Sequence, residues 1–155
     1  MPPYITAGYK TDEILAIKVS QGDKVFMQIH AVNNQLAMIK EYPNKVLDFA
    51  IHSYEPKMSG KVYTNMFVSQ RINDTETVLT NTRLNFTRNG PGPGYSVEEP
   101  QVMYPGNCAS MLKATRRILI VACPEEGLLE IYLANSLELV ANITKYQHFG
   151  FSDNI

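Results

Sequence analysis

The sequence of 155 residues lacks several features that would assign a function class at once. No apolar run approaches the ~20 residues needed to span a bilayer, and the start MPPYITAGYK has neither a basic segment before an apolar run nor a small-residue cleavage site. Fourteen basic and fifteen acidic residues give a formal net charge of -1, so no global field attracts nucleic acid or an anionic membrane. We therefore expect an intracellular protein of the cytoplasm or nucleus, without membrane association.

The sequence is also poor in groups that mark catalytic or metal sites. Two cysteines, Cys108 and Cys123, have no CxxC or CxxH spacing and fit a reducing compartment better than a disulfide framework. Three histidines, His30, His52 and His148, have no partner at catalytic or metal-ligand spacing. No Gly-x-Ser-x-Gly motif, phosphate-binding loop or EF-hand occurs. We expect inert cysteines, structural or surface histidines, no metal, no cofactor and no enzymatic activity.

What is present is the pattern of a β protein. Hydrophobic residues make up 45% of the chain and charged residues 19%, which is ordinary globular usage. Short runs of β-branched and aromatic residues alternate with a period of two and are separated by turn residues, whereas no sustained helical period occurs. The sequence therefore predicts a single all-β domain over residues 1–155. Its predicted strands are Ile14–Val19, Lys24–His30, Gln35–Lys40, Val46–Ser53, Val62–Gln70, Thr77–Phe86, Ile118–Cys123, Leu128–Leu133 and Leu137–Ile143.

Two parts of the chain echo each other. Residues 14–39 and 118–140 both read as strand, glycine turn, strand, asparagine turn and strand, with Gly22 matching Gly127. Repeated meanders of this kind build β-propellers, in which each blade is a small antiparallel sheet that cannot bury both faces alone. We expect antiparallel meanders of the propeller-blade type, about two blades in number, with a closed β-sandwich or barrel as the alternative fold.

The second copy carries a family resemblance. Within residues 117–143, the segments 129–132 (LEIY) and 137–140 (LELV) follow an apolar strand and a glycine turn. This order of segments resembles a blade of the large β-propeller scaffolds, notably the large subunits of the polyadenylation factor and of the damaged-DNA-binding complex. Similar scaffolds present a rigid disc to protein partners. The resemblance therefore implies a non-enzymatic scaffold that meets nucleic acid only through a larger complex, and it transfers no site residues.

One stretch, 87–106, interrupts the strand pattern with many prolines and glycines and predicts a long loop. Loops beyond ~12–15 residues are usually functional or mobile. Tyr95 and Tyr104 lie in this stretch, and tyrosine is enriched at interface hot spots. The run from Pro91 through Pro93 to Tyr95, PGPGY, resembles the Pro-Gly-rich repeat of sperm-tail and axonemal proteins, which implies a filament component as an alternative function; the same run also makes a stiff turn.

The last candidates are basic. Arg116 and Arg117 follow Lys113 just before a predicted strand, where cations can contact a phosphate backbone but more often keep a strand edge soluble. We expect an oligomer or complex subunit that binds proteins through strand edges or the Pro/Gly loop. A small β-barrel ligand-binding protein or enzyme is the remaining alternative. The expected partner-binding residues are Pro91, Pro93, Tyr95, Tyr104, Arg116 and Arg117.

Overall fold

The computed structural model describes residues 3–10, 14–31, 37–42, 44–57, 60–87, 95–104 and 109–144. Within these ranges the chain consists of antiparallel strands and one 3-10 turn, Pro124–Glu126, and contains no α-helix. No helix in this part of the chain is long and apolar enough to cross a membrane. The predicted all-β fold class is confirmed.

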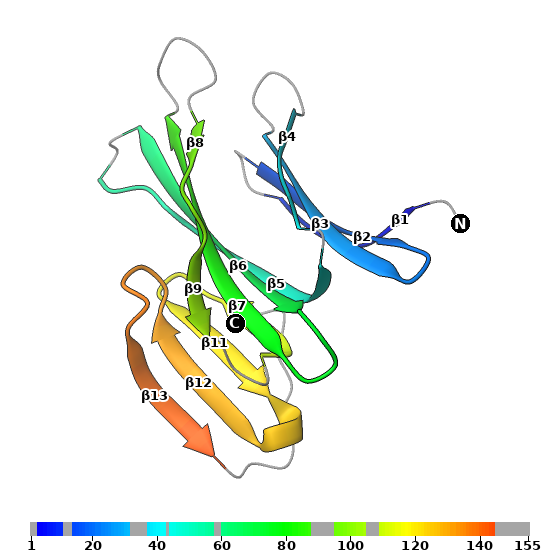
Figure 1. The fold of residues 1–155 in the computed structure, drawn as a ribbon. Helices are drawn as coiled ribbons and strands as arrows, with labels where there is room; N and C mark the ends of the chain where they lie inside the picture. The colour runs from blue at the N-terminus through cyan, green and yellow to red at the C-terminus, as the bar shows by residue number, and fades with distance from the viewer. Residues whose placement is uncertain are drawn as a thin grey trace.

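The strands form three antiparallel sheets, named A, B and C in chain order (Figure 1). Sheet A contains β1 (Tyr4–Lys10), β2 (Ile14–Gln21), β3 (Lys24–Ala31) and β4 (Ala37–Tyr42). Sheet B contains β5 (Lys45–Tyr54), β6 (Lys61–Arg71), β7 (Thr77–Thr87), β8 (Tyr95–Val97) and β9 (Gln101–Tyr104). Sheet C contains β10 (Met111–Ala114), β11 (Ile118–Cys123), β12 (Leu128–Leu133) and β13 (Leu139–Thr144). Sheets A and C are four-stranded meanders, and in sheet B the strand β9 pairs with β7 and not with β8. No described strand closes a sheet into a barrel, so the barrel alternative is wrong.

The predicted long loop at 87–106 is wrong in part. Two short strands, β8 and β9, form inside it, and both pair with β7. The 11-residue β7 offers them a long free edge, and each carries valine and tyrosine, which favour extended backbone. Pro100, which has no N–H to donate to a ladder, lies between the two strands.

The described residues form three sheets, more than the two blade-like units expected from the sequence. The echoed segments supply the second, third and fourth strands of sheets A and C. Gly22 begins the turn between the first two of these strands in sheet A, and Gly127 ends the corresponding turn in sheet C, with φ of 60° and 64°, which glycine adopts without strain. The three long strands of sheet B were predicted as strands but not as a further unit, because β6 and β7 have 11 residues each and are joined by a turn without glycine.

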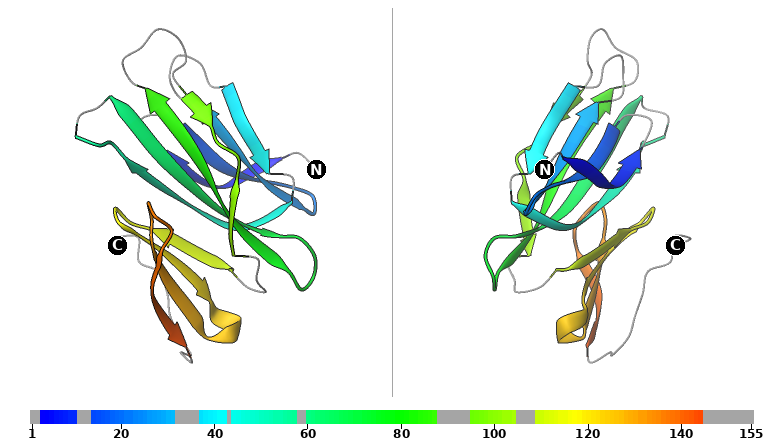
Figure 2. Two further views of the ribbon diagram at one scale, coloured as in Figure 1. Left: turned by 60° about the vertical axis from the view of Figure 1, so that its left-hand side comes forward. Right: turned by 90° about the vertical axis from the view of Figure 1, so that its right-hand side faces the viewer.

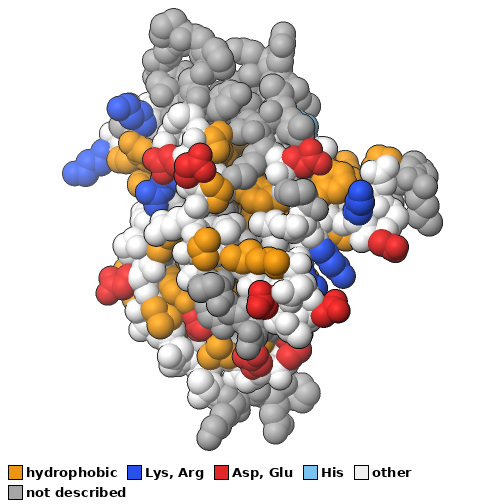
Figure 3. Space-filling model, viewed as in Figure 1, with side chains coloured by type: hydrophobic (Ala, Val, Ile, Leu, Met, Phe, Trp, Pro, Cys, Tyr) orange, Lys and Arg blue, Asp and Glu red, His pale blue; other side chains and the backbone are white. Residues whose placement is uncertain are grey.

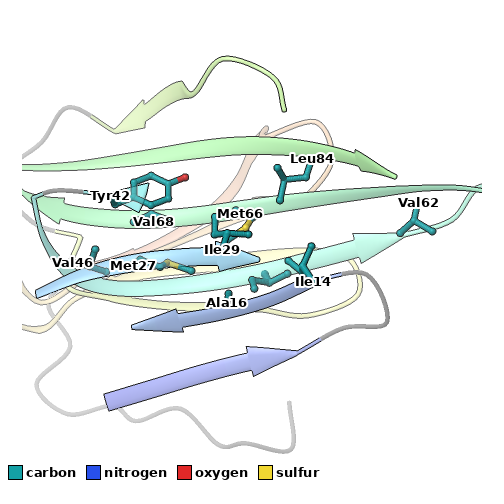
Figure 4. Close-up of a cluster of buried hydrophobic side chains, with 11 residues drawn as sticks. Ile14, Ala16, Met27, Ile29, Tyr42, Val46, Val62, Met66, Val68 and Leu84 are labelled. Carbon is teal, nitrogen blue, oxygen red and sulfur yellow. The ribbon is translucent and has the colours of Figure 1, made fainter. Parts of the chain in front are cut away.

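Sheet B lies between sheets A and C, as two views of the ribbon show (Figure 2). One hydrophobic cluster fills the space between A and B, where Met27 and Ile29 of β3 meet Met66 of β6 (Figure 4). A second cluster joins Phe67 of β6 to Leu119 of β11 between B and C. Burying each such side chain stabilises the fold by roughly 1.5–3 kcal/mol. The middle sheet is therefore packed on both faces.

One cysteine departs from the prediction. Cys123, at the end of β11, is disulfide-bonded, and no described cysteine is a free thiol. The sequence contains one other cysteine, Cys108, which lies outside the described residues. The prediction that the cysteines are reduced is wrong for Cys123.

Candidate functional site

The structure covers the predicted loop residues only in part. Pro91 and Pro93 lie outside the described residues. Tyr95 begins β8 and Tyr104 ends β9, and the side chains of both are also outside the described part of the chain. Their partners on β7 are seven residues apart, which is about 24 Å at ~3.4 Å per residue. The two tyrosines are therefore not brought together.

Arg116 and Arg117 lie in the turn between β10 and β11, and both are exposed. Their backbone carbonyls fix this turn to the rest of the molecule. The Arg116 carbonyl accepts a hydrogen bond from Nε2 of His52 at 2.7 Å, and the Arg117 carbonyl accepts one from the N–H of Ala134 at 2.8 Å. The turn is anchored while its cationic side chains point to solvent, and their role in partner binding stays a prediction.

A buried polar junction joins sheet B to sheet C around His52 of β5, which is 3% exposed. Because its Nε2 donates to the Arg116 carbonyl, its Nδ1 is an acceptor, and this atom lies 3.2 Å from Nδ2 of Asn65. Both ring nitrogens therefore have protein partners, as expected of a structural histidine. His30 lies 3.3 Å from a side-chain oxygen on its own strand, and His148 is outside the described residues.

Asn65 of β6 is fully buried and extends this junction across sheet B. Its Nδ2 also donates to the carbonyl of Ala134 at 3.4 Å. Its Oδ1 accepts hydrogen bonds from Nδ2 of Asn81 at 3.3 Å and from Nε of Arg83 at 3.1 Å. Arg83 in turn donates from Nη2 to the carbonyl of Asn135 at 3.2 Å. The junction thus ties β5, β6 and β7 to the turn between β12 and β13.

Asp48 makes a second polar link between the same two sheets. Its Oδ2 accepts a hydrogen bond from the backbone N–H of Leu112 on β10 at 2.7 Å, and its Oδ1 accepts one from the N–H of Phe49 at 2.9 Å. Burial raises the pKa of this carboxyl above its usual value, against the lowering effects of both hydrogen bonds and of Lys18 and Lys113. Asp48 therefore provides a directional hydrogen bond between sheets B and C, although burial disfavours the ionised form of its carboxyl.

The contact between sheets A and B is mainly apolar, with two hydrogen bonds added. Lys18 Nζ donates to the carbonyl of Leu47 at 3.3 Å, and the hydroxyls of Tyr42 and Thr82 lie 2.7 Å apart. Burial raises the pKa of Tyr42 to about 12, with the Thr82 hydrogen bond acting in the opposite direction.

The polar groups between the sheets act as anchors. They point at one another and at backbone carbonyls of sheet C. Among the described residues, no group of three or more His, Cys, Asp or Glu side chains could hold a metal ion. A buried network of this kind favours one position of its sheets, because any other position leaves buried groups unpaired. The candidate functional surfaces are therefore sought on the outside of the molecule.

Outer face A is the side of sheet A that points away from sheet B, and it is hollowed by a groove of about 380 Å³. None of the side chains that line the groove is charged. They are Pro3, Ile5, Ile17, Val19, Gln21, Phe26 and Gln28. Ile5 is 63% exposed, and neither Ile17 nor Phe26 belongs to the cluster between sheets A and B.

Outer face C is the corresponding side of sheet C. Leu119 and Val121 of β11 pack toward sheet B, so Ile118 and Ile120 between them point the opposite way. Cross-strand partners share a face, which adds the partners of these residues on β12 and β13. The apolar side chains of outer face C are Ile118, Ile120, Leu129, Ile131, Leu133 and Ile143. Lys113 of β10, opposite Ile120, adds a charged side chain to the same face. Figure 3 shows hydrophobic side chains at the surface in the lower part of the view, where sheet C lies, and on the right, where sheet A lies.

Comparison with protein-family models, with curated proteins and with solved structures finds no match for this chain. The resemblance to propeller scaffolds therefore stays a prediction. The function has to be argued from the surfaces of the chain itself.

Sequence reasoning missed both outer faces, although a signal for them was present. The strands β2 and β11 begin ILAIKV and ILIVAC, which are apolar at nearly every position. Near-continuous apolar runs are typical of strands that are covered on both faces, whereas alternation is typical of strands with one solvated face. These two strands therefore carry the pattern of sheets with a neighbour on each side.

Proposed function

We propose that this chain is a non-enzymatic protein-interaction module of the propeller-blade type, which supplies three blade-like sheets to a larger assembly. Consecutive antiparallel meanders that stack face to face in chain order are the arrangement of propeller blades (Figure 2). The observation that carries the proposal is the apolar outer face on each outermost sheet.

The outer faces differ from ordinary scattered surface hydrophobics. Ile5 and Ile143 are 63% and 51% exposed and belong to contiguous apolar surfaces of their sheets. Contiguous apolar surface on a folded protein marks an interaction site, because leaving it in water costs free energy in proportion to its area. The outer edges of β1 and β13, which pair with no other described strand, offer partners a further route through strand pairing.

The described residues bear on two further expectations from the sequence, the cellular location and the filament alternative. The disulfide at Cys123 argues against the predicted cytoplasmic or nuclear location, because disulfides persist mainly in oxidising compartments. The filament alternative rests on Pro91, Pro93 and Tyr95, and no described contact favours it. The interaction module is therefore the function that the described surfaces support best.

Site-specific photo-crosslinking tests the proposal. A photoreactive amino acid is placed singly at position 5, 143 or 72 in the full chain, which is irradiated in extract of its own cells. Ile72 serves as the matched control, because it is 55% exposed in the turn between β6 and β7, away from both outer faces. We expect protein crosslinks from positions 5 and 143 and few from 72. Equal yields at all three positions, or none at the two outer faces, would reject the interaction module.

A further inference from the structure

We infer that Asn73 is a glycosylation site, whose side-chain amide takes an oligosaccharide from a polyprenyl-diphosphate-linked donor. A bond forms between Nδ2 of Asn73 and the anomeric carbon of the sugar, and the bond between that carbon and the diphosphate oxygen breaks. The lipid diphosphate leaves with the electron pair, and the proton lost from Nδ2 passes to a base of the transferase. This modification goes beyond the proposed function and does not depend on it.

Three segments of the chain have the Asn-x-Thr pattern of an N-glycosylation acceptor, beginning at Asn73, Asn85 and Asn142. So short a pattern also arises by chance, and it is used only in chains that enter the secretory pathway. The disulfide at Cys123 points to such a compartment, because disulfides form and persist in oxidising environments and are rare in the cytosol. The bond and the pattern are independent features that indicate the same compartment.

The position of Asn73 suits a large hydrophilic group. Asn73 lies in the turn between β6 and β7, which projects from the end of sheet B (Figure 1). Residues 71–76 are all exposed. An attached oligosaccharide is bulky and must lie at the surface, so this turn can hold one without displacing any part of the core.

Hydrogen bonds hold the asparagine and the threonine of this acceptor together. Oδ1 of Asn73 accepts hydrogen bonds from the backbone N–H groups of Thr75 and Glu76, both at 2.9 Å. The Thr75 hydroxyl also donates to this oxygen, at 3.1 Å. Among the described residues, Nδ2 of Asn73 has no hydrogen-bond partner. Because glycosylation substitutes Nδ2 and leaves Oδ1 unchanged, the glycosylated turn keeps all three hydrogen bonds.

Asn85 has the same pattern in surroundings that do not suit a glycan. It lies within β7, which pairs with β6 on one side and with β8 on the other. Its Oδ1 is buried, and its Nδ2 lies 3.5 Å from Ser96 and 3.4 Å from Glu98. An oligosaccharide on this Nδ2 would break both contacts. Asn85 is therefore an internal control for Asn73.

Asn142 is exposed, but it lies within the strand β13 and directly opposite Glu130 of β12. Cross-strand partners share a face, so an oligosaccharide on Asn142 would stand against a neighbouring side chain of sheet C. Of the three acceptors, Asn73 is the one that lies in a turn and has an unpartnered Nδ2 among the described residues.

Peptide mapping of the protein isolated from its own cells tests the assignment. A peptide N-glycosidase leaves aspartate wherever a glycosylated asparagine stood, and an untreated sample controls for spontaneous deamidation. Trypsin then places the three acceptors in separate peptides, 72–83, 84–88 and 118–145. We expect aspartate at position 73 and unchanged asparagine at position 85, and mass spectrometry distinguishes the two. Unmodified asparagine at position 73 would overturn the inference.

Substitutions at Thr75 give a second, independent readout in the same cells. Thr75→Ala removes the acceptor pattern, whereas Thr75→Ser keeps the hydroxyl and the pattern. Thr75 is exposed, so neither change should unfold the chain. We expect Thr75→Ala to lose the added mass of one oligosaccharide, and Thr75→Ser and Asn85→Gln to keep it. A Thr75→Ala protein that retains this mass would place the modification elsewhere and overturn Asn73 as its site.

Discussion

The polar junction around Asn65 makes a quantitative prediction about how sheet C is held. Asn65→Ala removes hydrogen bonds to Nδ1 of His52, the Ala134 carbonyl, Nδ2 of Asn81 and Nε of Arg83. His52 and Asn81 are each 3% exposed, so water cannot easily replace the lost partner. Leaving a buried polar group unpaired costs about 1–3 kcal/mol. Counting these two groups alone, we expect the free energy of unfolding to fall by roughly 2–6 kcal/mol.

Asn85→Ala is the matched control for this substitution. Asn85 is also an asparagine of sheet B, but its buried Oδ1 has no hydrogen-bond partner, and its Nδ2 makes only long contacts of 3.4 and 3.5 Å with Glu98 and Ser96. Removing this side chain relieves an unpaired acceptor as well as removing weak contacts. We expect a change of less than ~1 kcal/mol.

Two measurements check the reasoning. Urea unfolding gives the free energies of the wild type, Asn65→Ala and Asn85→Ala, and amide hydrogen exchange reports where protection is lost. We expect Asn65→Ala to reduce protection in β11 and β12 of sheet C more than in β2 and β3 of sheet A. If Asn65→Ala costs no more than Asn85→Ala, or if both sheets lose protection equally, the junction does not hold sheet C.

Three further predictions concern single side chains. Burial raises the pKa of Tyr42 from about 10 to about 12, so its contribution to stability is present below pH 10 and is lost as the pH rises to 12. In urea unfolding across this pH range, the free energy of unfolding of Tyr42→Phe should therefore fall by roughly 2–3 kcal/mol less than that of the wild type. Asp48 also has a raised pKa in the folded chain, so its contribution is greatest below pH ~4, and the unfolding free energy of the wild type relative to Asp48→Asn should decrease as the pH rises from there. Gly22 has φ of 60° with open space around it, so Gly22→Ala should cost about 1–2 kcal/mol through backbone strain alone, while Gly22→Asn should cost less; equal melting temperatures for the two variants would contradict this.

The strands were the most predictable part of this structure, because their signal is local. β2, β3, β11 and β12 fall where the apolar period and the turns placed them. β13 begins at Leu139 rather than at Leu137, because Leu137 has φ of 63° and belongs to the preceding turn. The strands β1, β8, β9 and β10 were not predicted, since all four have seven or fewer residues and give little period to detect.

The polar junction could not be predicted, because it depends on register and on sheet packing. His52 and Asn65 are directly opposite each other on β5 and β6, a relation that exists only once the two strands are paired. Their partners on the side of sheet C are the backbone carbonyls of Arg116 and Ala134, which carry no residue-type signal. In the sequence, a histidine and an asparagine in strands read as isolated polar residues.

The two contacts between sheets inside the chain differ in kind, and this difference bears on how a partner would bind the outer faces. Directional hydrogen bonds from His52, Asn65 and Asp48 restrict sheets B and C to one relative position. The contact between A and B relies mainly on apolar packing, which tolerates small shifts and volume-conserving exchanges. The groove on outer face A, which is lined by uncharged side chains, resembles the A–B contact. A partner bound in this groove should therefore accept Ile5→Leu and reject Ile5→Glu, because what the contact requires is apolar surface and not a particular hydrogen bond.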